Sequence, residues 1–140
     1  MLGRTAQASH RGFTLIEIMV VVVIIGLLAA IVAPAVIGRI DTASINRAMQ
    51  DIRTIETAVN LYRLDKLTYP TMDEGLDALV TPAGSAAQSY LPRLPVDPWN
   101  RPYHYRIPGQ RGGDFDVFTY GADGQEGGEG IDADIGNWDL

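Results

Sequence analysis

The sequence contains no cysteine and only two histidines among its 140 residues. Without thiolates it can form neither disulfides nor the common cysteine-based zinc sites. The last twenty positions carry no Lys or Arg but hold 6 of the 17 acidic residues, and the formal net charge is −6. Nucleic acids are bound through clustered basic side chains, and no stretch supplies such a cluster. The composition therefore argues against a nucleic-acid partner, and the length suits one domain plus an appendage.

Catalytic signatures are also missing. The sequence has no G-x-S-x-G, H-E-x-x-H or phosphate-loop motif, and its histidines are His10 and His104. His104 lies in a segment rich in aromatic residues, so we expect it to be a strand residue rather than a general base. We therefore expect no enzymatic activity, and a membrane-anchored periplasmic enzyme is the alternative from another class.

The longest hydrophobic segment covers residues 13–33 and contains only two polar residues, Thr14 and Glu17. A helix of this length spans about 31 Å, the thickness of a bilayer core. Residues 1–12 carry basic residues and no acid, which keeps the N-terminus in the cytoplasm. The rest of the chain is then expected outside the membrane.

A cleaved secretory signal peptide is the alternative explanation, because Ala33-Pro34-Ala35 resembles a cleavage site. The apolar run is longer than a usual signal core of about 7–15 residues, and a helical pattern continues beyond it. The sequence thus predicts one helix over about residues 14–64, with its first half in lipid and Pro34 as either the membrane exit or a hinge. An apolar stripe with spacings of three and four residues marks its second half: Ile45, Ala48, Ile52, Ile55, Val59 and Tyr62.

The segment after the helix has mixed patterning. Thr71 and Glu74 have the spacing of a capping box, which predicts a short second helix. Prolines then exclude long regular elements over residues 81–102, and this segment is an ordered loop if four apolar side chains pack inward. Residues 103–107 and 115–120 predict an antiparallel hairpin. The predicted fold class is α+β, with the long helix packed on a small antiparallel sheet. The four side chains are Tyr90, Leu91, Leu94 and Trp99.

The segment Arg11-Gly12-Phe13-Thr14-Leu15-Ile16-Glu17, followed by a membrane helix, resembles the type IV prepilin signature. In that family a prepilin peptidase cuts after the glycine, and the new N-terminal residue is methylated. The resemblance implies a leader peptide over residues 1–12, cleavage between Gly12 and Phe13, and N-methylation of Phe13. Residues 13–36 would form the transmembrane and filament-core helix, and residues 37–140 a periplasmic domain.

Glu17 would be the fifth residue of the mature chain. A carboxylate in hydrocarbon is costly unless it is paired. The free amine of a processed Phe13 on a neighbouring subunit offers a partner that would set the stagger between packed helices. The alternative is that Glu17 only occupies the first helical turn, where the helix dipole lowers the free-energy cost of placing its carboxylate near hydrocarbon.

Five further segments resemble the major pseudopilin family of type II secretion, known as general secretion pathway protein G. The resemblance implies a homo-oligomeric helical filament in the periplasm that drives protein export through the outer membrane. The subunit would be a single-pass inner-membrane protein, with prepilin peptidase, minor pseudopilins and an inner-membrane assembly platform as partners. A type IV or minor pilin with an adhesive role remains an alternative. The segments are Tyr69-Pro70-Thr71, Glu74-Gly75-Leu76, Leu94-Pro95-Val96-Asp97-Pro98-Trp99, Gly121-Ala122-Asp123-Gly124 and Asp134-Ile135-Gly136-Asn137-Trp138.

In that family the acidic loop before the terminal tryptophan binds calcium. Hard carboxylate and carbonyl oxygens suit Ca²⁺, and the many glycines of this loop let carbonyls turn inward. The alternative is a solvated acidic tail. The predicted ligands are the side chains of Asp123, Asp132 and Asp134 and the carbonyls of Tyr120 and Gln125.

Overall fold

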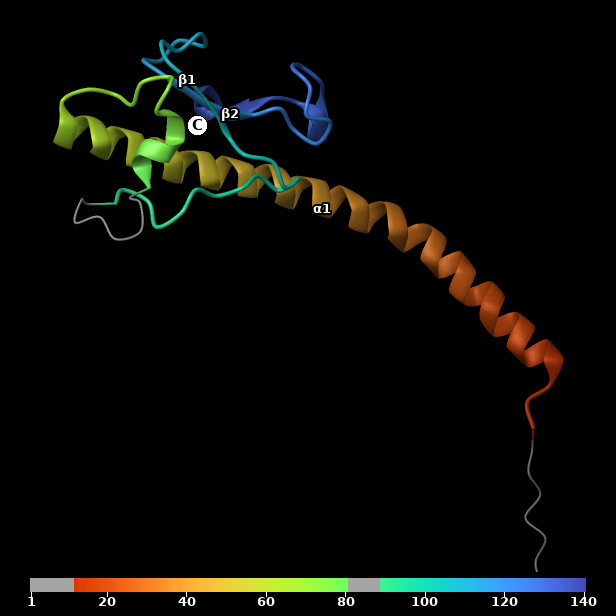
Figure 1. The fold of residues 1–140 in the computed structure, drawn as a ribbon. Helices are drawn as coiled ribbons and strands as arrows, with labels where there is room; N and C mark the ends of the chain where they lie inside the picture. Colours follow the sequence, from red (N-terminus) through yellow and green to blue (C-terminus); the bar gives the residue numbers. More distant parts are fainter. Residues whose placement is uncertain (1–11, 81–88) are drawn as a thin grey trace, which may run out of the picture. The chain divides into compact units, whose positions relative to one another are not determined.

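The computed structural model describes residues 12–80 and 89–140. The chain divides into two compact units, Met1–Gly38 and Arg39–Leu140. The elements of the described residues are one long α-helix, three short β-strands and three short 3₁₀ segments (Figure 1). Most of the predicted leader, residues 1–11, lies outside the described residues.

Helix α1 (Leu15–Lys66) agrees closely with the predicted span and contains Pro34. Its last turn carries Arg63 and Lys66, whose positive charges suit the C-terminal end of the helix dipole. Leu67 follows with φ of 61° and donates its N–H to the Arg63 carbonyl at 2.8 Å. This left-handed residue closes the helix.

The second half of α1 supplies one wall of the core of the Arg39–Leu140 unit. Ile52, Ile55 and Val59 are fully buried there, and the flanking stripe residues Ile45 and Tyr62 are partly buried. The predicted apolar stripe is therefore confirmed. The opposite wall comes from the sheet and the preceding loop, through Leu91, Tyr103, Phe115, Val117 and Ile135.

The sheet contains β1 (His104–Arg106), β2 (Asp116–Thr119) and β3 (Ile135–Gly136), in the order β1-β2-β3. Both pairings are antiparallel, with Tyr105 opposite Val117 and Thr119 opposite Ile135. The predicted hairpin is β1 and β2, whereas β3 is an addition that the sequence pattern did not predict.

The capping box is present, but the short second helix is η1 (Gly75–Leu79), a 3₁₀ segment. Thr71 N–H donates to Glu74 Oε2 at 3.0 Å, and Glu74 N–H donates to Thr71 Oγ1 at 3.3 Å. Leu76 and Leu79 are both buried. They are three residues apart, and a 3₁₀ helix with three residues per turn places both on the same face. In the following loop, residues 81–88 are outside the described part. The remaining apolar side chains pack on the core as predicted: Tyr90, Leu91, Leu94 and Trp99.

The C-terminal segment continues with η2 (Gly130–Asp132) and η3 (Asn137–Asp139) on either side of β3. The side chain of Asn137 forms hydrogen bonds with the backbone of and next to β2, as a neighbouring strand would. Its Oδ1 accepts from Val117 N–H, and its Nδ2 donates to the Phe115 carbonyl, both at 3.1 Å. The pairing of β2 on this side thus extends beyond the two residues of β3.

Candidate assembly and calcium-binding sites

The N-terminal part of α1 is not covered by any described part of the chain. Every described residue from 12 to 38 is exposed, including Phe13 at 84%. The most apolar 18-residue window of the helix has a mean hydropathy of 3.1, and none of it is buried. By length and composition this segment could cross a membrane or serve as a signal sequence. Either way, its apolar side chains need a cover that residues 12–80 and 89–140 of one chain do not provide.

Glu17 forms a second capping box, at the start of α1. Its Oε2 accepts from Thr14 N–H at 2.9 Å and from the Thr14 hydroxyl at 3.3 Å, while Glu17 N–H donates to Thr14 Oγ1. Glu17 therefore caps the first turn of the helix within one chain, which is the alternative role that the sequence offered. Gly12 and Phe13 lie outside the helix and are exposed, so the predicted scissile bond is accessible.

The C-terminal loop folds back on itself through its backbone. Ala122 N–H donates to the Ile131 carbonyl at 3.0 Å, and Asp134 N–H donates to the Gly127 carbonyl at 3.1 Å. A Cβ added to Gly121 or Gly128, both at positive φ, would come within 2.6 or 2.4 Å of the Asp132 backbone. Only glycine permits these two close approaches.

A buried carboxylate holds the base of this loop, and the sequence pattern did not reveal it. Asp97 is 1% exposed, and its Oδ1 accepts from the backbone N–H groups of Trp99 at 3.0 Å and Arg101 at 2.7 Å. Its Oδ2 accepts from the Thr119 hydroxyl at 2.6 Å. The available signal was an aspartate directly before a proline, which is common in turns.

Arg101 continues this connection into the acidic loop. Its guanidinium donates to the carbonyls of Gly121 at 2.8 Å and Ala122 at 2.7 Å. These two carbonyls therefore face a fixed positive charge on one side. The first turn of the predicted calcium loop is positioned by a residue that was not among the predicted ligands.

The predicted calcium ligands are only partly gathered. Asp123 Oδ1 accepts from the backbone N–H of Gln125 at 3.0 Å, and the Tyr120 ring packs on His104 at 4.7 Å between centroids. Asp132 approaches the glycines through its backbone. Within residues 12–80 and 89–140, no three acidic or histidine side chains lie close enough to hold one metal ion.

Asp134 is the ligand candidate with the strongest structural signal. Its side chain is only 9% exposed, and its Oδ2 accepts from Gly127 N–H at 3.0 Å. Its Oδ1 is buried and has no hydrogen-bond partner in the described part of the chain. A buried carboxylate oxygen without a partner is costly, and a hard cation would satisfy it. The oxygen donors of the loop are therefore of the kind that calcium prefers, and Asp134 is the ligand candidate whose environment a cation would satisfy.

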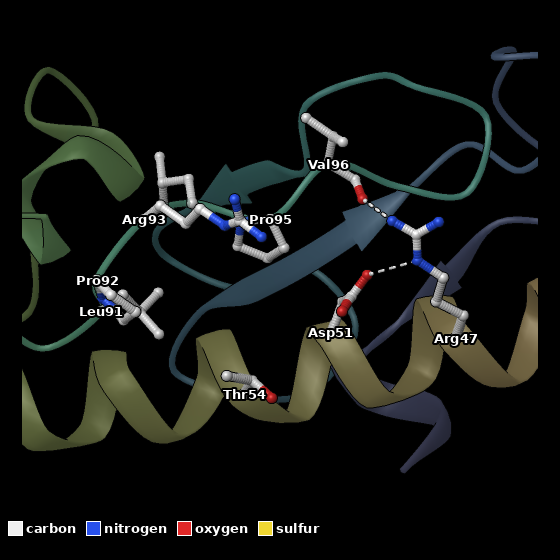
Figure 2. A pocket seen from close by; sticks show the side chains of 9 residues that line it. Arg47, Asp51, Thr54, Leu91, Pro92, Arg93, Pro95 and Val96 are labelled. Atoms are coloured by element: carbon white, nitrogen blue, oxygen red, sulfur yellow. Dashed lines mark hydrogen bonds and ion pairs between the residues drawn. The ribbon is translucent and has the colours of Figure 1, made fainter.

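A cavity of about 540 Å³ lies between α1 and the loop that contains residues 91–96 (Figure 2). Arg47 donates to the Val96 carbonyl at 3.2 Å and lies 3.7 Å from Asp51 Oδ2, as the dashed lines in Figure 2 show. Asp51 also accepts from the Tyr103 hydroxyl at 3.0 Å. Burial, together with this carboxylate, raises the pKa of Tyr103. These contacts attach the loop to the helix and present no nucleophile beside a base.

The predicted role of His104 as a strand residue is confirmed. It lies in β1 and is exposed, and its ring stacks on Phe118 with centroids 5.3 Å apart.

Comparisons with known proteins agree with this architecture. Residues 35–138 match the family model described as type II secretion system protein G, and residues 7–33 match the prokaryotic N-terminal methylation motif. The type II secretion system core protein G of Pseudomonas aeruginosa is 53% identical over 140 residues, which cover 95% of this chain and 98% of that protein. The core protein G of Vibrio cholerae is 51% identical over 135 residues, 92% of each chain.

A solved structure extends the likeness to three dimensions. The crystal structure of the major pseudopilin from the type 2 secretion system of enterohaemorrhagic Escherichia coli superposes with a TM-score of 0.61 at 38% identity, covering 74% of this chain and 94% of that chain. The long helix and the small antiparallel sheet are thus the expected fold. With a family model that covers most of the chain and relatives above 50% identity, this chain belongs to the type II secretion system protein G family.

Proposed function

We propose that this protein is the major structural subunit of a type II secretion pseudopilus. It polymerises into a helical filament in the periplasm, and the filament drives exported proteins through the outer membrane. The observation that carries the proposal is the contrast between a helix segment exposed at every described residue from 12 to 38 and a following unit that buries its own core. A lipid bilayer covers that segment before assembly, and other copies of the helix cover it afterwards.

The subunit works by assembly and has no catalytic role. It is stored in the inner membrane as a single-pass protein with its N-terminus in the cytoplasm and the Arg39–Leu140 unit in the periplasm. An inner-membrane platform extracts the subunits, and minor pseudopilins join the same filament. Membership of a secretion family supports these partners.

Prepilin peptidase cleaves the leader between Gly12 and Phe13, and the amine of Phe13 is then methylated. The match of residues 7–33 to the N-terminal methylation motif supports this step, since the motif spans the bond. The geometry supports it as well. The capping box of Thr14 and Glu17 starts the helix after the bond, which leaves an exposed, non-helical substrate for the peptidase.

Glu17 pairs with the amine of Phe13 on a neighbouring subunit during assembly. In the free subunit the Glu17 carboxylate is held by Thr14, which lowers the cost of keeping it near lipid. The amine of a neighbour offers it an opposite charge, and the energy of that pair depends on the stagger of the two helices. A correct stagger is therefore favoured over others.

Substitution of Glu17 tests the proposed function. In cells whose only copy is Glu17→Ala, insertion and processing should be normal, but filaments and secretion should be lost. Thr14→Val removes the capping hydroxyl and keeps the carboxylate, so it should still assemble. Glu74→Ala is the matched control, because Glu74 forms the same kind of capping box with Thr71 outside the hydrophobic segment. Normal filament yield from Glu17→Ala would contradict the pairing.

The C-terminal loop binds one calcium ion. The side chains of Asp123, Asp132 and Asp134 and the carbonyls of Tyr120 and Gln125 hold it, and the buried, unpartnered Asp134 Oδ1 is the main support. When bound, the ion neutralises the acidic side chains and fixes the loop. Sites of the extracellular type have dissociation constants of about 10⁻⁴ to 10⁻³ M. At the tighter limit, about 1 mM calcium adds roughly 1.4 kcal/mol of stability.

Thermal melting of the full-length protein in detergent micelles tests the calcium site. Calcium should raise the midpoint by several degrees over chelator, and magnesium should do so less because it keeps its waters. Asp134→Ala should abolish the calcium response, whereas the exposed Asp73→Ala should keep it. If calcium and magnesium raise the melting midpoint equally, or if calcium raises the midpoint of Asp134→Ala as much as that of the wild type, the proposed calcium site is wrong.

A further inference from the structure

Arg111, in the loop between β1 and β2, reaches across to the acidic loop. Its Nη2 lies 3.7 Å from Asp134 Oδ2, and its guanidinium lies over the Trp138 ring at 4.9 Å from the centroid. Sequence patterning did not single this residue out. It brings a positive charge to the carboxylate that anchors the proposed calcium site.

The contact between Arg111 and Asp134 is incomplete. At 3.7 Å the two groups attract each other as charges, but the distance exceeds that of a hydrogen bond. Asp134 Oδ1 has no partner at all in the described part of the chain. The buried carboxylate is therefore compensated by one nearby cation and one backbone N–H, which leaves it able to accept a better cation.

The two partners differ in their freedom to move. The side chain of Arg111 is 51% exposed, whereas that of Asp134 is 9% exposed. The guanidinium can therefore leave toward solvent while the carboxylate stays in place. Arg101 donates its guanidinium hydrogen bonds to the carbonyls of Gly121 and Ala122, and Arg106 donates to Gln110. Among the described arginines, Arg111 is thus the one that forms an ion pair with Asp134.

We propose that Arg111 is a built-in counter-ion, which neutralises Asp134 when no divalent cation is present and is displaced from it when calcium binds. The inference rests on the calcium site proposed above and adds a competitor to it. A divalent ion at the free Oδ1 and the guanidinium beside Oδ2 would repel each other across one carboxylate, so binding of the ion disfavours the contact of the guanidinium with Asp134. The guanidinium keeps the loop from opening in the free subunit, and it weakens the apparent affinity for calcium.

Calorimetric calcium titration of the full-length protein in detergent micelles tests the competition. Arg111→Gln removes the competing charge, so its apparent dissociation constant for calcium should be about two- to five-fold lower than that of the wild type, the range expected for loss of a half-exposed ion pair. Arg111→Lys keeps a positive charge and should therefore bind calcium more weakly than Arg111→Gln does. Arg106→Gln removes a charge from the same hairpin and the same pocket but breaks no ion pair with Asp134, so its calcium affinity should change less than that of Arg111→Gln.

Melting in chelator tests the counter-ion role separately. There, Arg111→Gln should melt below both the wild type and Arg106→Gln, because Asp134 has lost its compensating charge. Calcium should also change the tryptophan fluorescence of the wild type more than that of Arg111→Gln, since the guanidinium leaves the Trp138 ring.

The possible failures are distinguishable. If the wild type binds calcium and Arg111→Gln binds it equally or more weakly, the calcium site stands and the competition is overturned. If neither protein binds calcium, the site and the displacement are both overturned. An unchanged midpoint of Arg111→Gln in chelator overturns the counter-ion role, whatever calcium does.

Discussion

Replacing Asp97 by alanine should destabilise the Arg39–Leu140 unit severely. The lost carboxylate accepts three hydrogen bonds, from the N–H groups of Trp99 and Arg101 and from the Thr119 hydroxyl. A hydrogen bond to a charged group contributes about 1.5–3 kcal/mol. Water reaches the two loop amides more easily than the buried hydroxyl, so we expect a loss of about 3–4 kcal/mol rather than the full sum. This is a large share of a typical total stability of about 5–15 kcal/mol.

Urea unfolding followed by tryptophan fluorescence measures this loss. Both tryptophans of the chain, Trp99 and Trp138, lie in the Arg39–Leu140 unit, so the signal reports its unfolding and not that of the apolar helix. Asp97→Asn keeps one acceptor oxygen and should lose less than Asp97→Ala. Thr119→Val removes one donor and should lose least. A decrease in unfolding free energy below about 1 kcal/mol for Asp97→Ala would refute the argument that this carboxylate organises the loop.

Three further predictions concern processing, packing and pH. The mature chain should begin at Phe13 with one added methyl group, which intact-mass analysis of membrane-extracted protein detects; a start after Ala35 would instead identify a signal peptide. Ile55→Ala should cost about 2–5 kcal/mol in the same urea assay, because the side chain is fully buried, whereas Leu61→Ala, at a site 48% exposed, should cost far less. Burial raises the pKa of Tyr105 from 10.0 to about 12. The unfolded chain therefore loses this proton first, and stability should fall as pH rises from about 10 to about 12, less steeply in Tyr105→Phe; equal pH dependence of the two proteins would contradict the assignment.

Local periodicity accounts for the parts of the fold that were predictable from the sequence. The stripe from Ile45 to Tyr62 repeats at the helical period, so the buried face of α1 could be identified without knowing what covers it. The hairpin followed from composition and turn residues in the same way. For η1 the local signal was ambiguous, because Leu76 and Leu79, three residues apart, lie on one face of either an α-helix or a 3₁₀ helix.

Contacts between distant segments were not predictable from local patterns. Strand β3 has only two residues, and its pairing with β2 depends on the folded sheet rather than on its own propensity. The bond between Asp97 and Thr119 joins residues 22 positions apart. Within the candidate sites, the Gly12, Phe13 and Glu17 assignments came from a compact motif. The burial of Asp134 and its approach by Arg111 are known only from the structure.

The side chain of Asn137 has a consequence for crowded subunits. An open strand edge is a template on which a second chain can add a strand, which is the first step of aggregation. Val117 N–H and the Phe115 carbonyl would form such an edge beyond the end of β3, but the Asn137 amide occupies both. A subunit of a filament presents the same edge many times at short range. By covering that edge with a side chain, each copy keeps its sheet closed on this side.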